Sequence, residues 1–161
     1  MIRIEIDDRE VRQALENLRR RASNMTPAMH TIGQALMEGS RERILKGRDW
    51  TGRPFAPNSP ATLARKKGNK PLINEKSFVT SRLHYEASAD SVTVGSSAVQ
   101  AAVLQFGAKK GAFGATKRGG KIPWGDIPAR RYLPVQEDGQ LDDAARSLIL
   151  DAIRAHLADD R

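Results

Sequence analysis

The sequence predicts a single α+β domain in which a small, mostly antiparallel sheet packs against two or three helices. Two observations predict this class. Apolar residues recur at helical spacing in three long segments, 8–22, 27–46 and 140–158. Between them, residues 78–95 alternate apolar and polar side chains on both sides of a candidate turn, as a β-hairpin does. No repeat or clear boundary divides the chain, so we expect one domain over residues 1–161.

The N-terminal residues predict a short strand followed by the first helix. Apolar residues alternate with charged ones at Ile2, Ile4 and Ile6. This period is typical of a strand with one buried face. Asp7 is expected to cap the helix, with Glu10 completing a capping box. The apolar face of the helix is formed by Val11, Leu15 and Leu18.

The second helical segment carries clear end signals. Thr26 is predicted to cap it, and Pro27 suits the first helical position because no partner is needed there for its missing N–H. Gly47 is predicted to end the helix. Gly33 and Gly39 lie inside it, and we expect them to let another backbone approach closely.

Residues 47–60 are predicted to form a loop, because Gly, Pro, Asn and Ser dominate them. Trp50 and Phe55 lie in this loop. Aromatic side chains of that size are expected to pin the loop to the core or to be buried at an interface. Ser59 is expected to cap a short helix over residues 60–67.

A hairpin and a short buried helix are expected next. The hairpin joins a strand over residues 78–85 to one over 92–95, with a turn at 89–90. Residues 98–106 are apolar and uncharged, which predicts a short buried helix closed by Gly107.

The C-terminal part is predicted to contain a long loop, a strand and a helix. Residues 107–126 are rich in glycine and basic residues, and we expect them to form a mobile loop. Residues 127–135 predict one more strand, interrupted by Pro128 and Pro134. The helix over 140–158 has apolar residues at Leu141, Leu148, Ile149, Ala152, Ile153 and Leu157.

Composition narrows the class of protein. Hydrophobic residues make up 39% of the chain and aromatic residues 5%, so we expect a small, aliphatic core. The absence of cysteine excludes disulfides, thiolate metal sites and a cysteine nucleophile. No apolar run is long enough to span a membrane, and the N-terminus lacks the apolar core of a signal peptide. We therefore expect no membrane partner.

The net charge of +8 is unevenly distributed. Residues 41–82 carry a surplus of +8 and residues 107–131 a surplus of +6, whereas residues 132–161 carry −4. Two partners fit this distribution: a polyanion such as DNA, or an acidic protein surface, including that of another copy of the chain. A basic surface that is merely solvated is the alternative. Candidate contacts are Lys109, Lys110, Lys117, Arg118 and Lys121.

The sequence shows no arrangement of residues typical of an enzyme. His30, His84 and His156 lie on different predicted elements, and none has a second ligand at metal-binding spacing. Adjacent acidic residues lie near helix ends, where they cap helices or are solvated. The glycines near Gly120 depart from the phosphate-binding loop pattern. We therefore predict no catalytic activity, no metal and no cofactor.

Four segments form an ordered pattern, and they span residues 52–62, 92–96, 101–107 and 127–133. The residues that carry it are Phe55, Thr62, Gly95, Gln105, Phe106, Gly107, Ile127, Pro128, Ala129 and Arg130. The pattern resembles the phage virion morphogenesis family, which includes tail-completion and head–tail joining proteins of Mu-like and P2-like tailed bacteriophages. Its most specific part is Gln-Phe-Gly followed by Ile-Pro-Ala-Arg. Arg131 stands where the family usually has Pro.

The resemblance implies a structural protein of a tailed bacteriophage or prophage that acts in tail completion or head–tail joining through protein–protein contacts. It implies other tail or neck proteins as partners, and self-association, as in a ring. It also implies a location in the virion and, during assembly, in the cytoplasm of the bacterial host. The alternative is a basic nucleic-acid-binding accessory protein that contacts DNA non-specifically.

The motif residues have two interpretations. In the first they maintain the fold. Gly107 ends a helix, Phe106 anchors it in the core, and the planar guanidinium of Arg130 binds a carboxylate or backbone carbonyls. In the second interpretation the same residues contact a neighbouring subunit.

Overall fold

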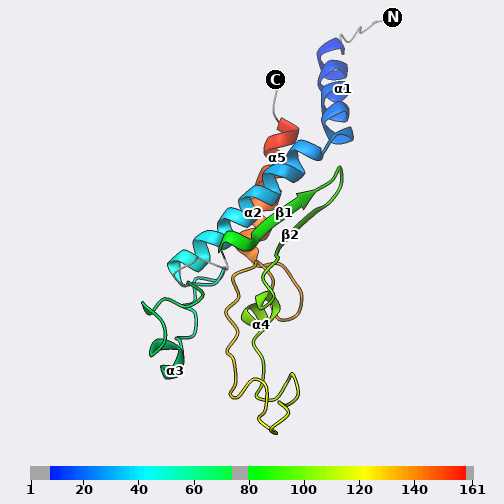
Figure 1. Cartoon of the computed structure of the whole chain (residues 1–161). Helices are drawn as coiled ribbons and strands as arrows, with labels where there is room; N and C mark the ends of the chain where they lie inside the picture. The colour runs from blue at the N-terminus through cyan, green and yellow to red at the C-terminus, as the bar shows by residue number, and fades with distance from the viewer. Residues whose placement is uncertain (1–7, 74–79, 159–161) are drawn as a thin grey trace, which may run out of the picture.

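The computed structural model describes residues 8–73 and 80–158 and shows a small α+β fold (Figure 1). In chain order the elements are α1 (Arg9–Ser23), α2 (Thr26–Lys46), α3 (Pro60–Leu63), the 3-10 turn η1 (Thr80–Arg82), β1 (Leu83–Ala87), β2 (Val92–Ser96), α4 (Ala101–Phe106) and α5 (Asp143–Ala158). Strands β1 and β2 form an antiparallel sheet that packs against α2. The predicted fold class is confirmed.

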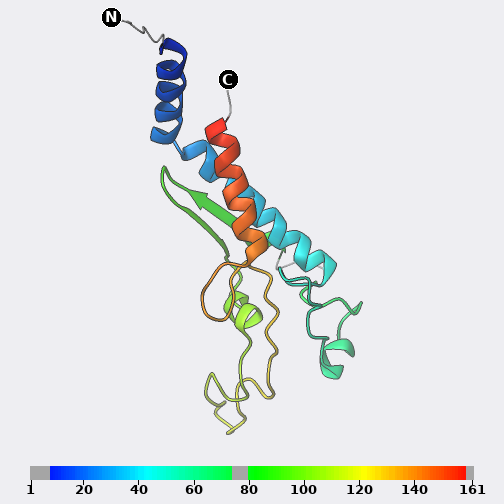
Figure 2. The ribbon, with the colours of Figure 1, turned by 180° about the vertical axis from the view of Figure 1, so that it is seen from behind.

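Helix α2 is the centre of the fold. The β1–β2 hairpin packs on one side of it and α5 on another, as the two opposite views show (Figures 1 and 2). The buried residues form two clusters. One consists of Ile44, Phe55, Leu83 and Tyr132, and the other of Ile32, Leu36, Trp50 and Ala145. Aromatic side chains lie in both clusters, so the core is less aliphatic than the composition predicts.

Two glycines of α2 give aromatic rings direct access to the helix. A Cβ atom on Gly33 would lie 2.3 Å from Cδ2 of Tyr85, and one on Gly39 would lie 2.6 Å from Cη2 of Trp50. The predicted close approach is therefore confirmed. The predicted partner, a second backbone, is wrong, because the rings of Tyr85 and Trp50 occupy the space that the missing side chains leave.

The C-terminal end of α2 agrees with the prediction, whereas its N-cap does not. The N-cap is Met25 and not Thr26, and no side chain caps the helix there. Pro27 lies at the start of the helix as expected. At the other end, Gly47 adopts a left-handed conformation with φ of 69° and closes the helix as predicted.

Helix α1 has Asp8 at its N-cap, without a capping hydrogen bond from the side chain. The carboxylate of Asp8 instead accepts a hydrogen bond of 2.8 Å from Nε of Arg12. Asp7, and the strand expected at residues 2–6, lie outside the described residues. The helix is present as predicted, but no residue of α1 is buried, and its apolar face of Val11, Leu15 and Leu18 is exposed.

The predicted hairpin is confirmed, with a shorter first strand than expected. Tyr85 in β1 lies opposite Val94 in β2. The strand begins at Leu83 because η1 occupies the residues before it, and residues 78–79 lie outside the described part. A hydrogen bond of 2.8 Å from the amide of Ser88 to the carbonyl of Ser91 closes the turn.

Helix α3 is shorter than predicted. Ser59 caps it as expected, since its Oγ accepts a hydrogen bond of 3.3 Å from the amide of Thr62. The helix nevertheless ends at Leu63, and residues 64–68 continue as turns and bends.

Helix α4 is neither as long nor as buried as predicted. It begins at Ala101, and Gln105 is its buried residue. Phe106 is 59% exposed, so the expectation that it anchors the helix in the core is wrong. Gly107 closes the helix as predicted, with φ of 75°.

The strand predicted over residues 127–135 is wrong. In the described structure this segment makes two isolated bridges, one between Ile127 and Ala108 and one between Val135 and Leu141. Its two prolines lack the N–H groups that a strand needs for continuous pairing. The predicted C-terminal helix, in contrast, is present as α5.

Candidate interaction surface

Gln105 joins the end of α4 to the residues that follow the Ile-Pro-Ala-Arg segment. Its side chain is 1% exposed. Oε1 accepts hydrogen bonds of 3.0 Å from the amides of both Tyr132 and Leu133. Nε2 donates to the carbonyls of Leu133 at 3.3 Å and Val135 at 3.4 Å. A single side chain thus supplies the donors and acceptors that a neighbouring strand would otherwise provide.

Arg130 fastens the same segment to the loop before α3. It is 7% exposed, and its Nε and one terminal nitrogen each donate a hydrogen bond of 2.8 Å, to the carbonyls of Ala56 and Pro57. Its own amide donates to the carbonyl of Leu104 at 2.8 Å. Burial lowers the pKa of Arg130 from its ordinary value. The structure therefore shows Arg130 binding backbone carbonyls, one of the two partners expected for it.

Gly107 lets two backbone segments meet. A Cβ atom on it would lie 2.6 Å from the carbonyl oxygen of Ile127 and 2.9 Å from the amide nitrogen of Ala129. Ala108 and Ile127 exchange backbone hydrogen bonds of 2.9 and 2.7 Å directly beside this contact. The Gln-Phe-Gly and Ile-Pro-Ala-Arg segments are thus joined through their main chains.

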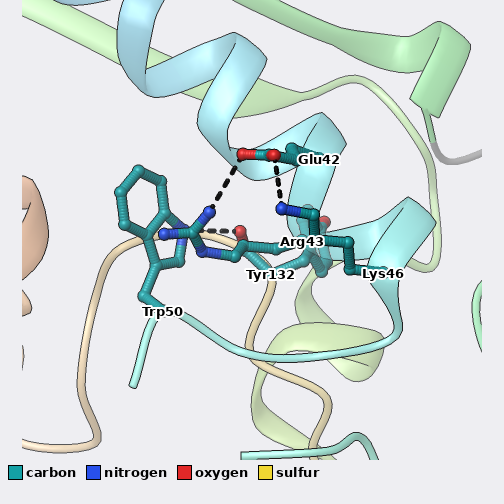
Figure 3. A network of polar contacts seen from close by, with 5 residues as sticks. All are labelled: Glu42, Arg43, Lys46, Trp50 and Tyr132. Carbon is teal, nitrogen blue, oxygen red and sulfur yellow. Dashed lines mark hydrogen bonds and ion pairs between the residues drawn. The ribbon is translucent and has the colours of Figure 1, made fainter. Parts of the chain in front are cut away.

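The loop after α2 is held by Trp50, which is 6% exposed (Figure 3). Its indole Nε1 donates a hydrogen bond of 2.9 Å to the carbonyl of Tyr132. The guanidinium carbon of Arg43 lies 4.5 Å from the centre of its ring system, a cation–π contact. Glu42 pairs with Arg43 and, at 2.6 Å, with Lys46, whose hydrogen bond and charge lower the pKa of Glu42. Trp50 and Phe55 therefore pin this loop to the core, as predicted.

A long projection, which we call the tongue, extends from these joined segments and comprises residues 108–127. In Figure 1 it reaches away from α1, α2 and α5, at the end opposite to both termini. Backbone hydrogen bonds hold its two arms together, including those from the amide of Gly111 to the carbonyl of Pro123 at 3.0 Å and from the amide of Thr116 to the carbonyl of Gly120 at 2.8 Å. The tongue corresponds to the predicted glycine-rich loop, whose mobility stays a prediction.

The tongue exposes large apolar side chains. Trp124 is 77% exposed, Phe113 is 56% exposed and Ile122 is 38% exposed. In most proteins such side chains lie in a core, so three exposed ones on a single projection indicate a surface that binds another molecule.

The tongue also carries all five of the predicted basic contact residues, and all are exposed. Lys109 pairs with Asp126 at 3.1 Å across the base. A hydrogen bond from the amide of Lys110, together with the interactions with Lys109, lowers the pKa of Asp126. Among the described residues, none of the other four cations forms an ion pair: Lys110, Lys117, Arg118 and Lys121.

The structure brings most of the motif residues together at the root of the tongue. A hollow of about 270 Å³ is lined in part by Thr62, Ile127, Pro128 and Arg130. A second hollow of about 680 Å³ is lined in part by Phe106, Gly107, Ile127, Pro128 and Ala129. Both share Asp126 at the base of the tongue.

Two motif residues serve other parts of the fold. Phe55 lies in the core, 8% exposed, beside Ile44 and Tyr132. Gly95 lies in β2, opposite His84. The motif is therefore largely a set of packing and hydrogen-bonding positions that fix the root from which the tongue projects.

The apolar residues of the tongue were not among the predicted contact residues. The predictions concerned its glycines and basic residues, and not Phe113, Ile122 or Trp124. Their signal was present, since large apolar side chains in a stretch of glycine and lysine have no nearby periodic pattern that would bury them.

Within residues 8–73 and 80–158, no group of three or more His, Asp or Glu side chains is placed to hold a metal ion. In the same part of the chain, no helix is both long and apolar enough to cross a membrane.

Comparison with known proteins identifies the family. A sequence model of the phage virion morphogenesis family matches residues 6–158, nearly the whole chain. The protein belongs to the phage virion morphogenesis family. No curated protein and no solved structure gives a significant match.

Membership of the phage virion morphogenesis family gives the chain a structural or assembly role in the bacteriophage particle. It implies interaction with other phage proteins, and assembly in the host bacterium and the virion. The resemblance inferred from the four sequence segments is confirmed.

Proposed function

We propose that the protein acts in tail completion or head–tail joining through protein–protein contacts, without catalysis, and that the tongue makes the principal contact. The observation that carries this proposal is the exposure of Trp124, Phe113 and Ile122 on one projection. Trp and Phe are enriched at the centres of protein interfaces and contribute much of their binding energy.

The charge of the tongue selects an acidic partner surface. Its cations and its exposed aromatic side chains lie on the same projection, so a partner groove must combine apolar walls with carboxylates. A second copy of this chain offers exposed carboxylates in its C-terminal part, at Glu137, Asp138, Asp143 and Asp151. We therefore propose contact between copies, as in a ring at the end of the tail.

The alternative, contact with DNA, is supported by one specific feature. Aromatic side chains interleaved with cations also suit nucleic acids, because bases stack on aromatic rings while cations neutralise phosphates. The two proposals differ in their dependence on salt, since binding to DNA weakens steeply as the salt concentration rises.

Complementation of a prophage that lacks this gene tests the proposal. The chain is supplied in trans as wild type, as Trp124→Ala, or as the double variant Lys117→Glu/Arg118→Glu. We expect both tongue variants to lower the yield of infectious particles, with separate heads and tails visible by electron microscopy. Matched changes away from the tongue, Leu150→Ala and Arg53→Glu, should support normal yields. A normal yield from the tongue variants would exclude the tongue as the principal contact.

Light scattering with and without duplex DNA separates the two partners. We would measure the solution mass at about 150 mM and about 500 mM salt. A discrete oligomer, or a monomer indifferent to DNA, supports protein contacts. Binding to DNA at the lower salt concentration that disappears at the higher one, and that Lys117→Glu/Arg118→Glu removes, supports the nucleic-acid alternative.

A further inference from the structure

Helix α1 carries an apolar stripe that the described part of the chain leaves open. Val11 and Leu15 are each 60% exposed, and Leu18 is 43% exposed. Their spacing of four and then three residues places them on one face of the helix. No residue of α1 is buried, so this stripe differs from the apolar faces of α2 and α5, which form the core.

Polar contacts at one end hold α1 in place. The guanidinium of Arg21 donates a hydrogen bond of 2.7 Å to the carbonyl of Leu157. Nε2 of His156 lies 3.0 Å from the carbonyl oxygen of Asn24 and 3.3 Å from that of Arg21. These contacts involve only the last turn of α1 and the residue after it, and the rest of the helix projects beyond α5 (Figure 2). They fix its direction while leaving the stripe uncovered.

An isolated helix of this length is marginal in water, and most helices in proteins are stabilised by packing of the apolar face. The 15 residues of α1 lack that packing within the described residues. We propose that the stripe is a docking surface for an amphipathic helix of another protein, one whose apolar stripe is flanked by Asp or Glu.

The flanks of the stripe specify the charge of this partner. Arg12 and Arg19 lie seven residues apart on one side of it, with side chains 77% and 82% exposed. Their ion pairs in the described structure are with Asp8 and Glu16 of the same helix. The end of the helix adds to the positive charge, because residues 17–23 contain three arginines and no acidic residue. Carboxylates beside the partner's apolar stripe would meet these guanidinium groups.

A groove on the other side of the stripe gives the partner helix room. It measures about 580 Å³ and lies between α1 and the end of α5. Leu18 and Leu157 contribute apolar walls, and Gln13 and Asn17 contribute polar ones. Charged side chains line the groove as well, at Arg9, Glu10 and Arg21. A helix laid along the stripe can therefore bury apolar side chains against both α1 and α5.

A second copy of α1 fits this surface poorly. Antiparallel pairing about Leu15 would place Arg12 of one copy beside Arg19 of the other. Parallel pairing would bring the arginine-rich ends of both helices together. Both arrangements set like charges against each other, which costs stability. A membrane surface also attracts basic amphipathic helices, but Glu10 and Glu16 place negative charge on the polar face of α1.

Two synthetic helical peptides of about 20 residues test the inference with the full-length chain. Both carry the same leucine stripe at heptad spacing, and they differ only in having Glu or Lys at every flanking position. We expect fluorescence anisotropy to show binding of the Glu peptide at least about tenfold tighter than that of the Lys peptide, a difference of about 1.4 kcal/mol.

Variants locate the binding on α1. Arg12→Glu/Arg19→Glu should reverse the preference, so that the Lys peptide binds more tightly. Leu15→Ser should remove binding of both peptides, whereas Leu150→Ser, at a leucine of α5 that is 44% exposed, should not. Circular dichroism confirms that each variant is folded. The inference is independent of the tongue, so Trp124→Ala should leave peptide binding unchanged.

Three outcomes would overturn the inference. Equal affinity for both peptides, or no binding of either, would show that the arginines do not select the partner. A dimer in light scattering that Leu15→Ser dissociates would assign the stripe to a second copy of the chain. Binding to phosphatidylglycerol vesicles that Leu15→Ser abolishes would assign it to a lipid surface.

Discussion

Gln105 and Tyr132 are joined by a buried hydrogen bond of 3.0 Å between the side-chain oxygen of the first and the amide of the second. The burial of Gln105 contrasts with the exposure of the residue that follows it. Phe106, directly after Gln105, is 59% exposed, while Gln105 itself is 1% exposed. From hydropathy alone, the phenylalanine would be expected in the core and the glutamine at the surface. The glutamine is buried because its amide matches backbone groups that two prolines leave without a partner strand.

Replacing Gln105 by Ala should destabilise the fold by about 2–4 kcal/mol. The change leaves the amides of Tyr132 and Leu133 buried without their acceptor and opens a cavity. Urea denaturation measures the loss. Gln140→Ala, at an exposed glutamine, is the matched control and should change stability by less than about 0.5 kcal/mol. Equal effects of the two changes would contradict the structural role assigned to Gln105.

Arg130→Lys should destabilise the protein by about 1–3 kcal/mol, even though the charge is kept. Lysine lacks the planar group that donates to the carbonyls of Ala56 and Pro57 at the same time. Arg131→Lys provides the control, because Arg131 pairs with the exposed carboxylate of Glu137. Thermal unfolding compares the two. If Arg130→Lys proved no more harmful than Arg131→Lys, positive charge alone would account for Arg130.

The sequence predicted the long helices and the hairpin because each has a local period. The stripe of α2 and the alternation in β2 are visible in neighbouring residues, as is the stop at Gly47. The strand expected at 127–135 failed because its residues show local β character while their hydrogen-bond partner, Gln105, lies more than 20 residues earlier. Local patterns carry no information about such a partner.

The candidate surface was predictable only in part. The basic residues of the tongue and the motif at its root were visible in the sequence. Whether an apolar residue is buried depends on the tertiary structure, so the exposure of Phe106 and of the α1 stripe was not predictable. The same holds for the aromatic rings that fill the spaces beside Gly33 and Gly39.

Two glycines with nearly the same φ should respond very differently to alanine. Gly107 has φ of 75° and Gly119 has φ of 77°. A Cβ on Gly119 meets open space, so Gly119→Ala should cost about 1 kcal/mol, from backbone strain alone. A Cβ on Gly107 meets the backbone of Ile127 and Ala129, so Gly107→Ala should cost about 3 kcal/mol or more.

Hydrogen exchange would show where the damage from Gly107→Ala falls. We expect the amides of Ala108 and Ile127, which pair at the root of the tongue, to lose protection first. The helical core of α2 should be affected less. Equal stability of Gly107→Ala and Gly119→Ala would show that the close approach at the root of the tongue contributes little.

Asp142 should make stability depend on pH in the direction opposite to an ordinary paired carboxylate. Asp142 is 6% exposed. It is therefore not solvated, which was one of the two roles predicted for adjacent acidic residues near helix ends. Burial, followed by the negative charge of Asp49, raises its pKa above the usual value, while Arg131 lowers it by a smaller amount. The folded state therefore holds this proton more tightly than the unfolded state does.

The contribution of Asp142 to stability is then greatest below the unfolded pKa and is lost as the pH rises through the folded value. Asp142→Asn keeps a side chain of the same shape and removes the buried charge, so it should be more stable than the wild type at about pH 7 and gain little at about pH 4. Urea denaturation at both pH values measures this difference. Asp138→Asn, the same change at an exposed position, is the control. A gain for Asp142→Asn that is equal at both pH values would mean that the charge of Asp142 is not what destabilises the folded state.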